Sequence, residues 1–200
     1  SSWGNNGYFW MTYDQPIAKI SQLLTEKAST SLKTYCYDDL GMTGSWGYTG
    51  GASTWGANVF QAADDEILQY AGFYTLNNNE TYEISVYDMG TSNTGSPTSG
   101  TKLASQTFTS PYAGYHTVNF ASQNKKITKG HYFSVVVKAP NMIATERAVS
   151  WATGGSYSSP VCNAGESYES YNGTTWSQKN DVNICIKAFT IKDSGGSTPV

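Results

Sequence analysis

Aromatic residues set among glycine, serine, threonine and asparagine are the most distinctive chemical feature of this sequence. A flat aromatic ring can stack on a sugar ring while neighbouring amide and hydroxyl groups bind the sugar hydroxyls. The sequence therefore predicts glycan contacts in two loop-like regions, at Trp46, Tyr48, Tyr157, Tyr171 and Trp176. The alternative is that each ring covers the end of a hydrophobic core. Residues 41–51 are rich in glycine, which argues against a packed strand there.

Acidic residues form adjacent clusters that suit calcium better than catalysis. Calcium takes about six to eight oxygen ligands and mixes carboxylates with backbone carbonyls. The candidates are Asp38, Asp39, Asp64, Asp65, Glu66 and Asp181. The sequence lacks the spacing of an EF-hand loop, so a structural calcium site would be assembled across loops. The alternative is that these acids are solvated turn residues.

The cysteines and histidines give no catalytic or zinc-binding pattern. Cys36, Cys162 and Cys185 lack the paired spacing of a zinc site. They are either three small buried thiols or, in an extracellular protein, include a Cys162–Cys185 disulfide. His116 and His131 lie in strand-like segments, and nothing local makes either one a base for a cysteine nucleophile. Adjacent acids also do not match the separated carboxylates of a glycosidase, so we predict no catalytic residue.

The composition of the chain argues against two classes of partner, nucleic acids and membranes. The 200 residues carry a net charge of −3 with 14% charged residues, which argues against nucleic acid as a ligand. No apolar stretch approaches the roughly 20 residues that a membrane span needs. Abundant serine, threonine and asparagine with 15 tyrosines indicate an extracellular or cell-surface location.

Short strands separated by turns dominate the chain. Alternation and turn residues predict strands over 32–37, 55–62, 66–75, 81–88, 102–108, 114–120, 131–138, 166–170, 175–176 and 182–190. Within one of them, Tyr82, Ile84 and Val86 share a face, as expected for a half-buried strand. Strands at this spacing without alternating helices indicate an all-β sandwich.

The first residues resemble part of a known enzyme family. Ser1-Ser2-Trp3-Gly4-Asn5-Asn6-Gly7-Tyr8-Phe9 is similar to the second half of the segment NSWG-x-x-WG-x-x-GY, which carries the active-site asparagine of papain-like cysteine peptidases. The resemblance implies that residues 1–14 are the last strand region of a peptidase domain. The catalytic cysteine, histidine and asparagine would then lie upstream, and none maps onto this sequence. Trp3, Tyr8 and Trp10 would pack as a remnant strand.

The remainder resembles a second family, on segments that span about residues 35–190. They include Tyr37-Asp-Asp-Leu-Gly41, Trp55-Gly-Ala-Asn-Val-Phe60, Tyr82-Glu-Ile-Ser-Val-Tyr87 and Asn183-Ile-Cys-Ile-Lys-Ala-Phe-Thr190. They are similar to the lectin-like domain that follows papain-like peptidase domains in surface proteins of bacteria and archaea. The resemblance implies a jelly-roll-like β-sandwich similar to carbohydrate-binding modules, sometimes with bound calcium. Asp39 departs from the family, which often has proline there.

These observations predict four segments and an accessory role. The segments are a peptidase remnant at 1–16, a connector at 17–34, a lectin-like sandwich at 35–191 and a linker at 192–200. We expect a non-catalytic module of a secreted or cell-surface papain-like cysteine peptidase. It would bind a glycan or cell-wall polymer or position the peptidase. The alternative is a structural spacer that packs on its own peptidase domain and stabilises or restricts it.

Overall fold

The computed structural model describes residues 31–48, 52–150 and 156–194. Within them the chain forms antiparallel strands and one short 3-10 helix, η1 (Ala121–Gln123), with no α-helix. No helix among these residues is long and apolar enough to cross a membrane. The peptidase-like residues, including Trp3, Tyr8 and Trp10, lie outside the described part, so their predicted packing stays a prediction.

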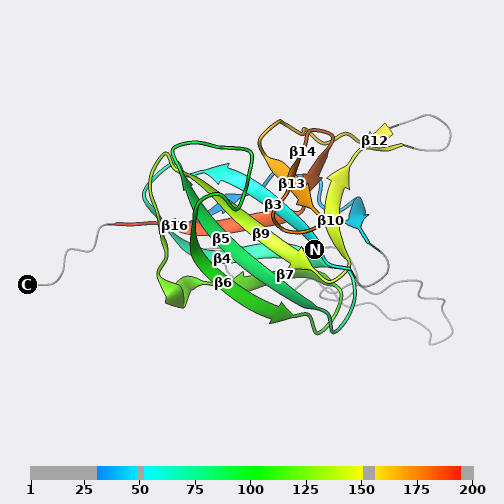
Figure 1. Cartoon of the computed structure of the whole chain (residues 1–200), viewed down its shortest axis with the longest axis horizontal. Coiled ribbons are helices and arrows are strands. Elements are labelled where there is room, and N and C mark those ends of the chain that lie inside the picture. The colour runs from blue at the N-terminus through cyan, green and yellow to red at the C-terminus, as the bar shows by residue number, and fades with distance from the viewer. Residues whose placement is uncertain (1–30, 49–51, 151–155, 195–200) are drawn as a thin grey trace, which may run out of the picture.

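Two large sheets form the body of the molecule (Figure 1). The six-stranded sheet has the order β14 (Ser177–Lys179), β13 (Ser167–Ser170), β3 (Thr54–Gln61), β9 (Tyr132–Ala139), β5 (Thr81–Gly90) and β6 (Thr101–Thr109). The five-stranded sheet has the order β1 (Leu32–Tyr35), β16 (Ile186–Lys192), β4 (Glu66–Thr75) and β7 (Gly114–Asn119), and β8 (Lys126–Ile127) also pairs with β4. The predicted all-β fold is confirmed.

Two smaller sheets close one end of the body. The three-stranded sheet has the order β15 (Val182–Ile184), β10 (Met142–Arg147) and β2 (Gly44–Gly47). The two-stranded sheet pairs β11 (Val149–Ser150) with β12 (Ser156–Ser158). Strands β2 and β12 of these sheets contain Trp46 and Tyr157, and Tyr48 follows β2.

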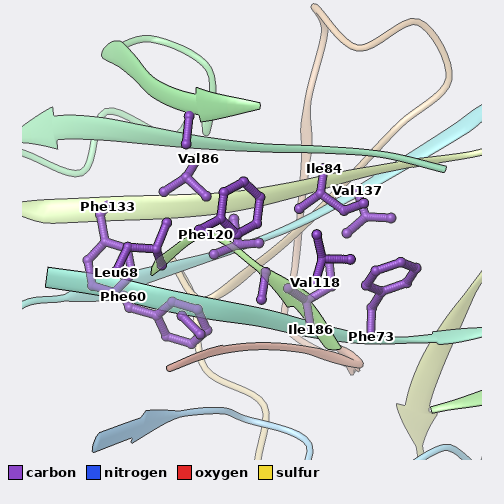
Figure 2. Packing of buried hydrophobic residues seen from close by; sticks show 14 of the residues in the cluster. Phe60, Leu68, Phe73, Ile84, Val86, Val118, Phe120, Phe133, Val137 and Ile186 are labelled. Carbon is purple, nitrogen blue, oxygen red and sulfur yellow. The ribbon is translucent and has the colours of Figure 1, made fainter. Parts of the chain in front are cut away.

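The core lies between the two large sheets (Figure 2). Ile84 and Val86 of β5 are fully buried, and Tyr82 is 2% exposed, so the predicted apolar face of this strand is confirmed. Phe73 of β4 and Ile186 of β16 belong to the same cluster from the other sheet. The period-2 alternation of apolar residues therefore sets which face of each sheet turns inward.

The structure corrects two expectations about strands. Residues 44–47 form strand β2 despite their glycine content, because β10 supplies an antiparallel partner and Trp46 packs against the core. The strand expected over 182–190 is divided at Cys185, where the chain passes from the three-stranded to the five-stranded sheet. The pattern of residues in the sequence does not predict strand β10.

Candidate functional site

Three of the predicted glycan contacts come together at the end of the molecule that β2 and the β13–β14 hairpin form. The ring of Tyr171 lies with its centroid 4.5 Å from that of Trp46 and 4.6 Å from that of Tyr48. Trp46 is half-buried against the core, whereas Tyr48 is 43% and Tyr171 52% exposed. Trp46 therefore covers the core, and the two tyrosines present aromatic faces to solvent. We call these three residues the tyrosine surface.

Side-chain hydrogen bonds fix the hairpin that carries Tyr171. Asn172 Oδ1 accepts bonds from the backbone N–H groups of Thr174 and Thr175 at 2.9 and 2.8 Å. Ser170 Oγ accepts the N–H of Gly173 at 2.9 Å, and Gly173 has φ +74°. Asparagine and glycine suit such a turn because one bonds its own backbone and the other adopts positive φ freely. The Asn172-Gly173 turn therefore holds the ring of Tyr171 in place.

The other two predicted aromatic contacts do not join this surface. Trp176 lies in a separate cluster on the six-stranded sheet, and its Nε1 donates a hydrogen bond to Thr98 Oγ1 at 3.1 Å. The side chain of Tyr157 lies outside the described residues. Glycan binding by any of these residues stays a prediction.

The six predicted calcium ligands do not form one group. Asp38 lies near Cys185, whereas Glu66 pairs in register with Lys192, at the other end of β16. Seven residues of strand separate these two ends, about 23 Å. Two predicted ligands precede Glu66 in the chain. Asp64 forms an ion pair with Lys192, and Asp65 accepts a hydrogen bond from the backbone N–H of Lys129. Asp181 pairs with Lys179 at 3.4 Å, and exposed Asp39 accepts a weak bond from the Cys36 thiol.

A different cluster of oxygens has more acceptors than donors. Asn183 Nδ2 lies 2.8 Å from Glu146 Oε2, 2.8 Å from Tyr37 O and 2.9 Å from Val161 O. An amide nitrogen carries two hydrogens, so it cannot donate to three acceptors at once. Asn183 Oδ1 is also buried without a hydrogen-bond partner. We call these four residues the Asn183 corner.

The Asn183 corner offers the ligand types that calcium prefers. The Glu146 carboxylate and two backbone carbonyls converge on the Asn183 amide, and a 180° flip of this amide would turn its Oδ1 toward them, which gives four hard oxygen ligands. Within the described residues, no three Asp, Glu, His or Cys side chains gather closely enough to hold a metal ion. Carbonyls would therefore supply part of the ligand set. The residues present fit the calcium that the family resemblance implies.

A buried ion pair lies next to this corner. Asp38 is 2% exposed, and its Oδ1 lies 2.7 Å from Lys187 Nζ. Neither carboxylate oxygen of Asp38 accepts a hydrogen bond of good geometry. Burial raises the pKa of the Asp38 carboxyl, and the Lys187 ammonium offsets part of that rise. Asp38 is thus a predicted calcium ligand that adjoins the Asn183 corner, through its chain neighbour Tyr37 and the nearby Glu146.

The three cysteines are free thiols. The Cys162–Cys185 disulfide is therefore not formed in the structure. Cys185 is buried where the chain changes sheets, and burial raises the pKa of its thiol. Cys162 is half-buried beside Pro160 O, with its thiol pKa also raised by burial. Of the three cysteines, Cys185 is buried as the alternative interpretation held, whereas Cys36 and Cys162 are half-buried.

Sequence reasoning missed the Asn183 corner because its members are far apart in the chain. Glu146 and Asn183 are opposite residues of the β10–β15 pair. Only a correct strand assignment for β10 would have placed them together, and its short polar sequence shows no clear alternation.

Comparisons with known proteins agree with this fold. The family model of the lectin-like domain matches residues 34–190. The crystal structure of the cysteine protease and lectin-like domains of Cwp84, a surface layer associated protein of Clostridium difficile, is similar, with a TM-score of 0.64 and 24% identity. A structure of the clostridial cysteine protease Cwp84 after propeptide cleavage gives a TM-score of 0.65 and 24% identity.

The two Cwp84 structures are longer than this chain. Each match covers 84% of this chain but only 37% and 42% of the respective Cwp84 chains. No curated protein sequence matches the chain significantly. The match to the family model over residues 34–190, together with the shared fold, shows that the chain belongs to the lectin-like domain family.

Proposed function

We propose that this chain is the non-catalytic accessory module of a secreted or cell-surface papain-like cysteine peptidase and that it binds a surface glycan. The tyrosine surface is the observation that carries the proposal. Two exposed rings lie side by side and a hydrogen-bonded hairpin holds one of them, that of Tyr171, so little conformational freedom is lost when a ligand stacks on them.

The comparisons support the link to a peptidase. Cwp84 combines a cysteine protease domain with a lectin-like domain and is a surface layer associated protein. By this analogy the module would hold its peptidase domain near a cell-wall or surface polysaccharide. Tethering raises the local concentration of substrate without new chemistry.

Removing both exposed rings tests the proposal. The full chain is mixed with insoluble cell-wall polysaccharide, and the bound fraction is measured by sedimentation. Tyr48→Ala combined with Tyr171→Ala should weaken binding about tenfold, because each aromatic contact is worth about 0.5–1.5 kcal/mol. Tyr112→Ala is the control, since Tyr112 is 53% exposed on another loop. Unchanged binding by the double variant would contradict the tyrosine surface. Failure of the wild-type chain to bind any fraction would favour the spacer role instead.

We also propose that the Asn183 corner binds calcium as a structural ion. Glu146, Asn183 and the carbonyls of Tyr37 and Val161 would be the ligands. The support is the excess of acceptors around Asn183 Nδ2 and the unpartnered Asn183 Oδ1.

Thermal unfolding with calcium and with a chelator tests this second proposal. Calcium at a hundredfold excess over its Kd should stabilise the chain by about 2.7 kcal/mol, because it binds only the folded state. Glu146→Gln should lose this response, whereas Asp181→Asn, an exposed acid outside the corner, should keep it. A wild-type melting temperature that changes by less than about one degree would exclude a tight site.

A further inference from the structure

The outer face of the six-stranded sheet carries two adjoining hollows. One has a volume of about 60 Å³ and is lined in part by Trp55, Tyr87 and Thr98. The other has a volume of about 240 Å³ and extends to Thr107 on β6. Glu83 and Lys138 line both hollows, which makes them one continuous depression across strands β3, β9, β5 and β6. We call it the sheet groove.

Strand register places three side chains in one row along the floor of the groove. Lys138 of β9 is opposite Trp55 of β3 on one side and Glu83 of β5 on the other. Opposite residues of an antiparallel pair lie on the same face of the sheet, and neighbouring strands are about 4.8 Å apart. Figure 1 shows β9 between β3 and β5. The row of Trp55, Lys138 and Glu83 therefore runs across the strands for about 10 Å.

The β13–β14 hairpin and the loop 91–100 bound the groove. At one end, Gly173 of the β13–β14 hairpin lies against the indole of Trp55, and a Cβ at this position would be 2.8 Å from Trp55 Nε1. The loop 91–100 forms the other wall, where Thr98 accepts the Trp176 hydrogen bond and Pro97 O accepts one from Ser134 Oγ. The glycine leaves space that any larger residue would fill.

The polar groups in the groove are available to a ligand. Within the described residues, the Glu83 carboxylate makes no hydrogen bond or ion pair, although Lys138 is opposite it. The Lys138 ammonium lies 5.4 Å from the centroid of the Trp55 ring and likewise pairs with no carboxylate in this part of the chain. A carboxylate accepts hydrogen bonds and an ammonium donates them. Together they match hydroxyl groups, which do both.

We propose that the sheet groove binds a neutral oligosaccharide that lies across the strands, from Trp55 toward Thr107. This proposal deepens the proposed function and rests on it. The single acid and single amine give the floor no net charge, which favours a neutral ligand over an acidic or a basic one. The groove spans several strands, so it suits a chain of sugars better than one ring.

The groove adjoins the tyrosine surface. Tyr171 and Gly173 lie two residues apart in one hairpin, with Tyr171 beside Tyr48 and Gly173 beside Trp55. The Tyr48 N–H also bonds Thr54 Oγ1, next to Trp55. A sufficiently long glycan would pass from the tyrosine surface over the hairpin into the groove. Affinity should therefore increase with chain length until the ligand fills both regions.

Calorimetric titration of the full chain tests the proposal. The probes are neutral hexasaccharides of glucose, mannose and N-acetylglucosamine, their disaccharides, and polygalacturonate as an acidic polymer. We expect one neutral hexasaccharide to bind at least tenfold more tightly than its disaccharide. Glu83→Gln and Lys138→Met should each weaken that binding about fivefold or more, whereas Lys129→Met, an exposed lysine elsewhere, should not change it. Melting temperatures confirm that each variant is folded.

The outcomes separate this proposal from the proposed function. If the tyrosine variants lose cell-wall binding while Glu83→Gln and Lys138→Met keep wild-type affinity, the groove proposal fails and the proposed function stands. Binding of polygalacturonate alone would also overturn the groove proposal. If the wild-type chain binds neither the cell wall nor any saccharide, both fail.

Discussion

At the residue scale, buried acids connect strands of this molecule. Glu66 is 1% exposed, and its two carboxylate oxygens accept bonds from Tyr35 Oη, Lys33 Nζ and Thr190 Oγ1. These donors come from β1 and β16, so one carboxylate joins three neighbouring strands. Charge-assisted hydrogen bonds of this kind are stronger than neutral ones. Sequence alone could mark Glu66 as an acid near a turn, but its donors are 31 to 124 positions away.

Glu169 should make stability depend on pH. Burial raises the pKa of its carboxyl, and Lys179 lowers it by less. The folded chain thus holds this proton to a higher pH than the unfolded chain, so ionisation removes stability as the pH rises from the unfolded to the folded pKa. Glutamine has no ionisable carboxyl group, so Glu169→Gln does not lose this stability. The free energy of unfolding of Glu169→Gln relative to wild type should therefore increase between about pH 4 and 7. Urea unfolding across this range measures the difference. The exposed Asp39→Asn, away from Lys179, is the control, and a pH-independent difference for Glu169→Gln would contradict the prediction.

At the scale of elements, alternation decides what the sequence can predict. Strands β4 and β5 are long and alternate clearly, and the sequence predicts them almost to the residue. Strands β2 and β10 have four and six residues; β2 pairs with β10, and β10 pairs with both β2 and β15. Such pairing cannot be read locally, so the Asn183 corner, which depends on β10, could not be predicted. The tyrosine surface could be predicted in part, because Tyr48 and Tyr171 lie next to recognisable turn residues.

Gly56 of β3 should resist enlargement because it marks a close approach of sheets. A Cβ there would lie 2.5 Å from Ile143 Cδ1 and 2.9 Å from Ile184 Cγ2, both in the core. Gly56→Ala should therefore destabilise the fold by about 1–3 kcal/mol through overpacking. Chemical denaturation gives the value. Gly72→Ala is a useful comparison, because the nearest atoms belong to the phenol end of Tyr115, which can swing away, and the Phe189 ring is 3.1 Å from the added Cβ. An equal or smaller loss for Gly56→Ala would refute the packing argument.

At the scale of the whole molecule, one core serves both large sheets. Ile84 and Val137 come from the six-stranded sheet, and Phe73 and Ala188 from the five-stranded sheet, yet all belong to one cluster. The chain also crosses between sheets at Cys185, with buried residues on both sides. Separating the two large sheets would expose this shared core, and the six-stranded sheet would keep only its smaller buried cluster around Val59, Val136 and Tyr168.

The shared core predicts a single unfolding transition. Amide hydrogen exchange at Val137 and Ala188 should report the same free energy of opening, equal to that of global unfolding. Exchange at low denaturant, followed by NMR, measures both. Thr101, at the start of the edge strand β6, should open at a lower free energy and serves as the internal control. A lower value at one of the two core positions would show that the sheets unfold separately.

The pairing of β1 with β16 has a mechanical consequence. Leu32, at the start of the domain, is opposite Ile191, near its end, so these two residues lie about 5 Å apart. Segments attached before β1 and after β16 therefore leave from the same end of this strand pair. A pulling force applied between these two segments would act at one end of the strand pair. It would therefore break the β1–β16 hydrogen bonds one after another, instead of loading all of them at once in shear. Because its two ends lie close together, the domain can be inserted into a longer protein with little change in the direction of that protein's chain. Under tension, however, it would unfold at low force.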